Sequence, residues 1–400
     1  MSTAAHKLDL AAPPVVKTME RRSLIIGVAA SLIAVVLALK NPSDFFHAYL
    51  VNVMLWLGIA LGSMAILMLR HLTKGAWGMI IRRTLGAAMR TIPLVTLFFV
   101  PVALDVFLGK THLYIWLDKA AIAKSEHLQH ITRSYLSPWG FVTRAALYFT
   151  IWNVLSFFLT KWSREQDQPG RDHTARFKAL SGPGLILYAF TISFAAIDWV
   201  MSLDPTWMST IYGLLILIGE LLAALSFAVI VERILFRYEP MSELLKPEQV
   251  HDHGKFMLAF IMVWAYFSFS QWLIIWAGNL PEEITWYMRR LHGGWGGVGL
   301  FLVIFHFAVP FTILLSRSFK RDVTKLVWLA VWMLIVRYID LFWIIEPNFS
   351  TTFRVSLADI VLPFAMGGLW MWYFFRNLGS MALVPAYDPF AKEVLEAAHD

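Results

Sequence analysis

The sequence contains no cysteine and little charge. Of its 400 residues, 15% are charged and 58% are hydrophobic, whereas soluble domains usually carry about 25% charged residues. The absence of cysteine excludes disulfides, iron–sulfur ligation and covalent haem attachment through C-x-x-C-H within this chain. The low charge excludes an ordinary soluble enzyme and indicates an integral membrane protein.

Long apolar runs are abundant, and about 20 apolar residues suffice to span the hydrocarbon core as a helix. We predict an all-α integral membrane fold, with a transmembrane domain of ten helices over residues 23–377 and tails over 1–22 and 378–400. The ten predicted spans lie near Ser23–Leu39, His47–Leu69, Ile92–Leu108, Gly140–Thr160, Pro183–Met201, Ser209–Leu235, Lys255–Ala277, Val298–Leu315, Leu326–Ile345 and Ser356–Phe375.

Lysine and arginine are distributed unevenly between the two sides that ten spans define. The side with both termini and the even-numbered loops holds 22 of them, and the opposite side holds 8. Because positive residues are enriched in cytoplasmic loops, we expect both termini in the cytoplasm. Arg21 and Arg22 precede a short first span, which is also the pattern of a secretory or twin-arginine signal. The simpler interpretation is that they hold the start of the first helix in the cytoplasm.

Three loops are long enough to contain structure of their own. Arg70–Thr91 is basic with interspersed apolar residues, which predicts a helix on the inner leaflet with its arginines near the headgroups. Gly109–Trp139 is long enough for an interfacial helix. Gly278–Gly297 mixes acids, aromatics and arginines, so it is expected to form a docking surface or to carry function.

Ionisable side chains inside the predicted spans are few. Each needs a partner, water or a neutral form, because charge in hydrocarbon is unfavourable. Arg337 and Asp340 are three residues apart on the ninth span, so they share a face and can pair. Glu220 lies in the middle of the sixth span with no basic residue within one helical turn. The other candidates are Arg144, Asp198, Glu232, His306 and Asp359.

Two interpretations of these residues stay open. In the expected orientation most of the charges lie in the outer half of the membrane with Arg337 and Glu220 deeper, as in a proton path entered from outside. Glu232 would continue the path inward, but it lies roughly 18 Å from Glu220 along the helix, so other groups or water must fill the gap. The same charges would also serve as static ion pairs that hold helices together.

The histidines do not form an obvious cofactor site. His306 is in the middle of a predicted span, but bis-histidine haem ligation needs two facing histidines. We expect a hydrogen-bonded core histidine, with quinone contact or proton relay as alternatives. Short histidine groups in loops are frequent by chance, so we expect no metal site from the remaining pairs, which are His127 and His130 beside Glu126, and His251 and His253 beside Asp252.

Four stretches of the sequence are distinctive. They are residues 180–184 (LSGPG), 195–213 (AAIDWVMSLDPTWMSTIYG), 269–290 (FSQWLIIWAGNLPEEITWYMRR) and 337–343 (RYIDLFW). Together they resemble the F subunit of bacterial alternative complex III, a quinol:cytochrome c oxidoreductase. That subunit belongs to the NrfD-like, polysulfide-reductase-type membrane proteins. The resemblance covers nearly the whole chain after residue 45.

The resemblance implies two four-helix bundles with flanking helices in the bacterial inner membrane. It implies a scaffold for the membrane arm that has no metal cofactor of its own and supplies a proton path. Quinone or quinol is the ligand that the family label suggests. The expected partners are membrane lipids and, in the same complex, an NrfD-like quinol-oxidising subunit, an iron–sulfur subunit, and multihaem and monohaem cytochromes c carrying the haems. A terminal oxidase is a further expected partner, and nucleic acid is not expected.

Two other functions remain as alternatives. One is a quinol-binding membrane anchor of a polysulfide-reductase-type molybdenum–iron–sulfur oxidoreductase, which the same family likeness would allow. The other is a secondary transporter acting alone, which favours paired inverted repeats with broken helices around a midplane site. No such pair is visible in the sequence.

Overall fold

The computed structural model describes residues 9–75, 77–109, 111 and 113–385. All regular structure in these ranges is helical, and ten spans are long and apolar enough to cross a membrane. The predicted all-α integral membrane class is therefore confirmed. The spans are α1 (Pro14–Lys40), α2 (Pro42–Thr73), α3 with α4 (Trp77–Met89 and Ile92–Leu108), α7 (Pro138–Glu165), α8 (Thr174–Trp199), α9 (Tyr212–Leu235), α11 (Pro247–Gly278), α13 with α14 (Trp295–Leu302 and Val309–Leu315), α16 (Val323–Ile345) and α17 (Leu357–Leu378).

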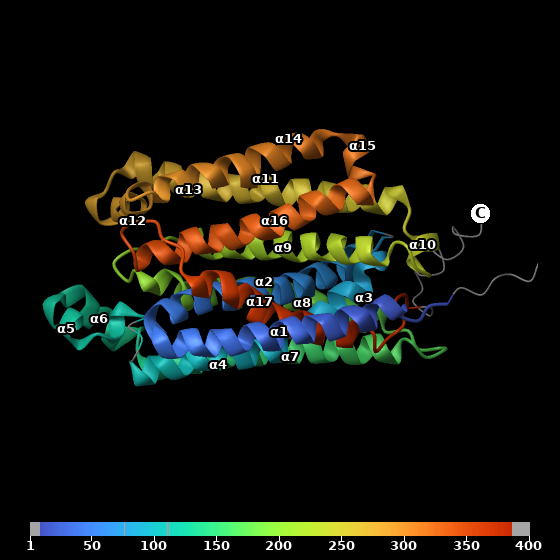
Figure 1. Cartoon of the computed structure of the whole chain (residues 1–400), viewed down its shortest axis with the longest axis horizontal. Coiled ribbons are helices and arrows are strands. Elements are labelled where there is room, and N and C mark those ends of the chain that lie inside the picture. The colour runs from blue at the N-terminus through green and yellow to red at the C-terminus, as the bar shows by residue number, and fades with distance from the viewer. Residues whose placement is uncertain (1–8, 76, 110, 112, 386–400) are drawn as a thin grey trace, which may run out of the picture.

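Short helices connect the spans at the two ends of the molecule. We call the end where α1 begins and α17 finishes the terminal end, and the opposite end, where α5, α6 and α12 lie, the loop end (Figure 1). The loop end contains η1 (Ile115–Leu117), α5 (Lys119–Lys124), α6 (Glu126–Ser134), η2 (Met201–Leu203), α12 (Pro281–Leu291) and η4 (Glu346–Asn348). The terminal end contains α10 (Met241–Leu244) and α15 (Arg317–Lys320).

The spans form two four-helix groups and a flanking pair. In the first group α2, α4, α7 and α8 contact one another in a ring. In the second group α9, α11, α13 with α14, and α16 do the same. The two groups meet where α2 packs on α9, and α17 contacts α2 while α1 lies along α17 (Figure 1).

Small residues allow the closest helix contacts. A Cβ atom added at Gly368 of α17 would lie 2.4 Å from the Cα of Gly27 of α1, so the two backbones touch there. Without a hydrophobic driving force in lipid, close backbone packing of this kind is a main source of helix association. The most apolar window of α2 is 94% buried, whereas that of α1 is 11% buried. α2 is therefore a central helix, and α1 presents most of its surface to the membrane.

Several helices extend beyond the predicted spans. α1 begins at Pro14 and α11 at Pro247, each earlier than predicted, and proline is favoured in the first helical turn. Polar residues continue these helices past the apolar core, where hydropathy alone gives no signal. Residues 1–8 and 386–400, which include most of the predicted C-terminal tail, lie outside the described residues.

The expectation that residues 70–91 lie on the membrane surface is wrong for α3. Arg82 and Arg83 are each 2% exposed. Arg82 donates a hydrogen bond of 2.8 Å to Oε1 of Gln166, and Arg83 forms an ion pair with Asp167. These protein partners take the place of the headgroups because α3 packs against α2, α9, α11 and α17.

The contact between α1 and α17 gives a test of this packing. Gly368→Ala should destabilise the protein by about 1–3 kcal/mol, since overpacking of a filled contact forces the backbones apart. Gly182→Ala is the matched control, because nothing lies within 4 Å of a Cβ at that helical position, and it should be neutral or slightly stabilising. Thermal unfolding in detergent measures both. Equal midpoints for the two variants would contradict the close contact.

Candidate functional site

Glu220 lies where the two four-helix groups meet. Its side chain is 1% exposed, and Tyr188 of α8 donates a hydrogen bond of 2.7 Å to its Oε2. The second oxygen, Oε1, has no hydrogen-bond partner in the part of the chain that the structure describes. The carboxyl group is thus buried with half of its hydrogen-bonding capacity unused.

Two glycines of α2 make the space in which Glu220 lies. A Cβ at Gly58 would be 3.0 Å from the Cγ of Glu220, and a Cβ at Gly62 would be 2.3 Å from its backbone oxygen. Any larger residue at Gly62 would push α2 away from α9. The sequence therefore places Glu220 against the backbone of the neighbouring helix.

Arg337 and Asp340 form the ion pair that their spacing predicts. Arg337 donates to Oδ2 of Asp340 at 2.6 Å and to the backbone oxygen of Ile216 at 3.3 Å, and the pair is buried. The guanidinium lies directly on Gly219, where a Cβ would be 2.2 Å from its Cζ. Because Gly219 precedes Glu220, this pair on α16 is adjacent to the turn of α9 that carries the free carboxyl oxygen, and Arg337 is within electrostatic range of Glu220.

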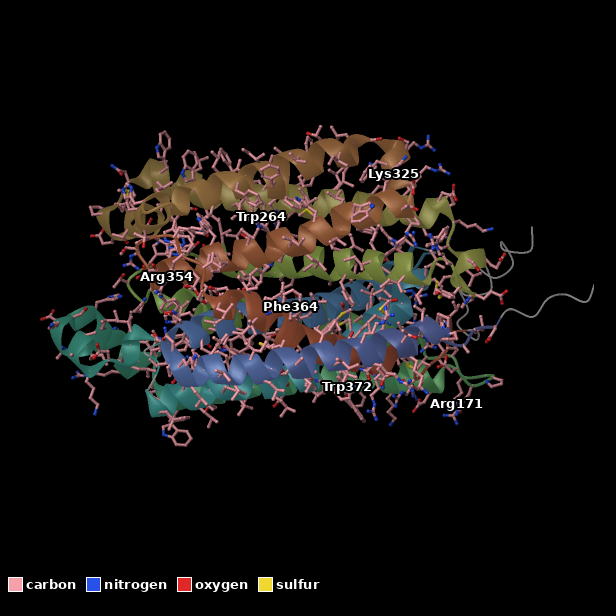
Figure 2. The ribbon with its side chains drawn as sticks, in the orientation of Figure 1. Arg171, Trp264, Lys325, Arg354, Phe364 and Trp372 are labelled. Carbon is pink, nitrogen blue, oxygen red and sulfur yellow. The ribbon has the colours of Figure 1, made fainter. Side chains whose placement is uncertain are left out.

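His306 lies in a distorted stretch of the eighth span. The segment η3 (Val303–Ala308) is π-helical. Pro310, four residues after His306, has no N–H to donate to the carbonyl of His306, and its ring crowds that carbonyl. The buried ring of His306 stacks on Trp264 of α11 at 3.8 Å between centroids. Trp264 lies well away from both ends of the molecule (Figure 2).

The expected hydrogen bond of His306 is not present, since neither ring nitrogen has a partner among the described residues. Single π-helical turns are frequent at functional sites. His306 is also within electrostatic range of Arg337. This places it in the second four-helix group on the side of the Arg337–Asp340 pair.

Glu232 has a partner that the sequence did not reveal. Nδ1 of His253 on α11 lies 3.1 Å from the carboxylate of Glu232, and Nε2 lies 2.7 Å from the backbone oxygen of Trp77. Both side chains are buried. The predicted seventh span began at Lys255, which left His253 outside the membrane. From the sequence alone, His253 is therefore a candidate only for metal binding.

Two buried hydroxyl groups lie between the pairs at Glu220 and Glu232. Ser226 of α9 and Ser181 of α8 have no hydrogen-bond partner for Oγ within the described ranges. Counted from the Tyr188–Glu220 hydrogen bond, both are roughly 10 Å along their helices toward the terminal end. Ser226 divides the stretch of α9 between Glu220 and Glu232 into two intervals of about 9 Å each.

The remaining predicted residues lie at the loop end, each with its own structural partners. Arg144 contacts both oxygens of Asp198 at 2.8 and 2.9 Å, and Tyr148 donates to Asp198 at 2.9 Å. Asp198 is about 15 Å along α8 from Tyr188, so it is not part of the Glu220 cluster.

Asp359 caps the start of α17. Its Oδ2 accepts hydrogen bonds of 2.7 and 2.8 Å from the backbone nitrogen and the hydroxyl of Ser356, which is a capping box. Glu346, just past the predicted end of the ninth span, is 5% exposed and within electrostatic range of Asp359. The sequence gives no sign of this burial, because Glu346 follows the last residue of α16 and begins the short η4 turn.

Arg290 on α12 is a further residue that sequence reasoning missed. It is fully buried, donates to the backbone oxygens of Trp286 at 3.0 Å and Ile344 at 2.6 Å, and lies 3.5 Å above the Trp286 ring. Burial lowers the pKa of Arg290 to about 9, so the side chain is charged at neutral pH. It holds α12 on the last carbonyls of α16, where a positive charge is favourable.

The histidine groups in the sequence do not converge on a metal. His127 lies 3.2 Å from the backbone oxygen of Pro205, and His253 faces Glu232 while Asp252 pairs with Lys255. No group of three or more candidate ligands could hold a metal among the residues that the structure describes.

Comparison with known proteins does not assign the chain to a family. The chain matches no protein-family model, and a search of curated proteins found no similar sequence. The function proposed below therefore depends on the residues and the geometry already described.

The Arg337–Asp340 pair gives a test of the site's construction. Asp340→Asn should destabilise the protein by about 3–5 kcal/mol, because it leaves Arg337 as an uncompensated buried charge. The double variant Arg337→Met/Asp340→Leu should recover most of the loss, since well-packed apolar residues often replace a buried ion pair without a net penalty. Thermal or denaturant unfolding in detergent compares the three proteins. If Asp340→Asn unfolds like the wild type, Arg337 is not stabilised by this pairing.

Proposed function

We propose that this chain is a membrane subunit of a quinol-oxidising complex of the alternative complex III type. In this proposal it lies in the bacterial inner membrane with both termini in the cytoplasm, holds no redox centre and conducts protons. Three features support it: the four sequence stretches that resemble the F subunit, the two four-helix groups with a flanking pair, and the basic bias of the side with the termini.

The observation that carries the proton role is the state of Glu220. A carboxylate that serves only as structural glue is expected to use its oxygens in hydrogen bonds, as Asp198 does with Arg144 and Tyr148. Glu220 instead has one hydrogen bond from Tyr188 and one unpartnered oxygen. A buried carboxyl with a free oxygen can accept and release a proton without breaking an ion pair.

Polar groups continue from Glu220 toward both ends. The Arg337–Asp340 pair lies beside the preceding residue, Gly219, and would supply the outer side of the route. Toward the terminal end, the unpartnered hydroxyls of Ser226 and Ser181 lie at intermediate positions along α9 and α8, and the Glu232–His253 pair lies beyond them. Intervals of about 9 Å are too long for a direct proton hop, so the proposal requires water between these groups. We assign Arg144 and Asp198 to holding helices at the loop end. Asp359 also has one oxygen without a partner in the described ranges, but its other oxygen caps α17 at the loop end, so we assign it to the helix start.

The complex is tested by gentle purification of the tagged full-length chain from its native membranes. We expect it to copurify with a multihaem cytochrome c, seen as a c-type absorbance spectrum, and with an iron–sulfur protein. Copurification with a molybdopterin enzyme would instead favour the polysulfide-reductase-type anchor. Recovery of the chain alone, with transport activity after reconstitution, would favour a secondary transporter and contradict the proposal.

The proton role is tested by Glu220→Gln in the purified complex, reconstituted in vesicles. The substitution keeps the shape and removes the titrating group, so quinol oxidation under uncoupled conditions should stay nearly intact while the number of protons moved per electron falls. Glu282→Gln on the exposed start of α12 is the matched control and should match the wild type. An unchanged proton-to-electron ratio in Glu220→Gln would leave structural glue as the better account of the buried charges.

A further inference from the structure

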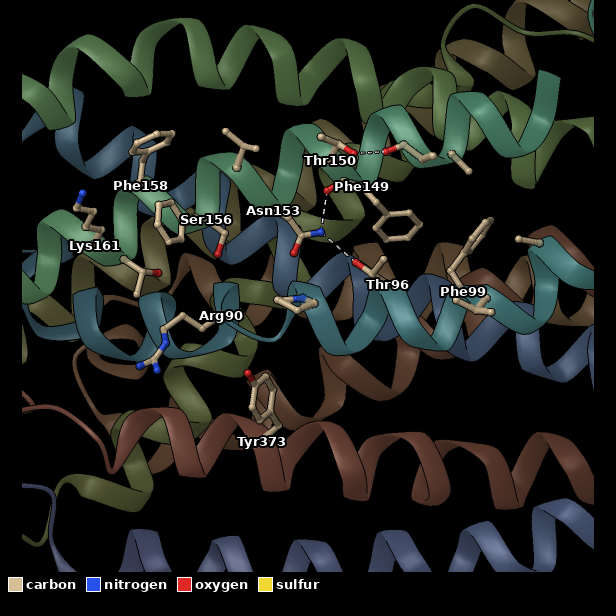
Figure 3. Close-up of a pocket in the computed structure, with 18 of the residues that line it drawn as sticks. Arg90, Thr96, Phe99, Phe149, Thr150, Asn153, Ser156, Phe158, Lys161 and Tyr373 are labelled. Carbon is tan, nitrogen blue, oxygen red and sulfur yellow. Dashed lines mark hydrogen bonds between the residues drawn. The ribbon is translucent and has the colours of Figure 1, made fainter. Parts of the chain in front are cut away.

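A large groove runs along the outside of the first four-helix group, between α4 and α7. Its volume is about 1220 Å³, and Tyr373 of α17 contributes to its lining near Arg90 (Figure 3). Pockets for drug-sized ligands are usually roughly 300–1,000 Å³, so this groove suits a larger molecule. It contains none of the residues assigned above to the proton path.

The end of the groove near the terminal end is positively charged. Arg90, Lys161 and Arg164 line it, and none has a carboxylate within ion-pair distance in the described ranges. The one acidic lining residue, Glu165, lies 2.9 Å from His173. Arg90 and Arg164 are within range to repel each other. The cluster therefore has excess positive charge beside an apolar surface, which is the condition that attracts an anion.

The groove becomes apolar away from the charged end. Arg90 donates to the backbone oxygen of Asn377 at 3.3 Å, and further along Asn153 donates to Thr96 at 3.1 Å (Figure 3). Beyond this point the lining is formed by Phe99, Val100, Ala103, Val142, Ala146 and Phe149. From Arg90 to Ala103 the chain rises roughly 20 Å, somewhat more than the ~15 Å of hydrocarbon in one leaflet.

We propose that the groove holds one anionic phospholipid of the leaflet at the terminal end. Its phosphate would lie between Arg90, Lys161 and Arg164, and its acyl chains along the apolar part. The groove has its charge at one end and mostly apolar side chains along the rest, including Phe157 and Phe158 near the charged end, which matches a charged headgroup with acyl chains. A quinone head carries no charge, so it would leave the three cations uncompensated. In the proposed orientation this is the cytoplasmic leaflet, whose anionic lipids attract basic residues.

The test is native mass spectrometry of the purified full-length protein in detergent. Phosphatidylglycerol and phosphatidylcholine with identical acyl chains are added in parallel, and retention of each lipid is compared. We expect phosphatidylglycerol to be retained in one-to-one stoichiometry at activation energies that remove phosphatidylcholine. Equal retention of both would show a general apolar surface and overturn the proposal.

Three variants locate the binding. Lys161→Gln/Arg164→Gln should lower phosphatidylglycerol retention several-fold, and both side chains are exposed, so the fold should tolerate the change. Arg237→Gln/Arg317→Gln removes the same charge from exposed terminal-end positions, in the loop after α9 and at the start of α15, and should have no effect. Ala146→Phe fills the apolar part and should lower retention with every charge in place.

Each variant can also contradict the proposal. If both double variants lose phosphatidylglycerol retention equally, the binding depends on net surface charge and not on the groove. Unchanged retention in Ala146→Phe would place the lipid outside the groove. Displacement of phosphatidylglycerol by an equimolar quinone would assign the groove to quinone instead. Thermal unfolding of each variant without added lipid separates loss of binding from loss of fold.

Discussion

The close approach of α2 to α9 is the contact on which the rest of the structure depends. Gly62 lets the backbone of α2 reach the backbone oxygen of Glu220, where a Cβ would be only 2.3 Å away. This contact joins the two four-helix groups and makes α2 the most buried of the ten spans. The contact that joins the two groups is thus also the packing around Glu220, so a substitution at Gly62 would alter both at once.

The membrane forces every buried charge to find its partners within the protein, and this chain does so in two ways. Arg144 and Asp198, and likewise Arg290 with its three backbone carbonyls, use most of their hydrogen-bonding groups. Glu220 and His306 leave ring or carboxyl atoms without partners in the part of the chain that the structure describes. The first kind is suited to holding helices. The second kind retains the freedom to bind a proton or water.

Hydrophobic runs predicted the spans because a helix in lipid must be apolar over its length. The Arg337–Asp340 pair was also predictable, since both residues belong to one helix and three-residue spacing fixes their shared face. Tyr188 and His253 were not predictable as partners, because a single sequence does not show which helices are neighbours. Arg82 and Arg83 were placed at the headgroups on charge alone. Their partners Gln166 and Asp167 follow α7, more than 80 residues later.

In the proposed proton route, the buried Glu232–His253 contact is a place where a proton would be held without an uncompensated charge. The backbone oxygen of Trp77 can only accept, so Nε2 of His253 must carry a hydrogen. The other proton of the contact lies either on Nδ1, giving an ion pair, or on Glu232, giving two neutral groups. Moving it between them leaves the net charge and the number of hydrogen bonds unchanged. Glu220 has no such partner for its second oxygen, so a proton that reaches it must be exchanged through water or a neighbouring hydroxyl. In the proposed proton route, α9 supplies the Glu232–His253 pair at the terminal end and Glu220, with one unpartnered oxygen among the described residues, where the two groups meet. Water between these two positions would be needed for conduction.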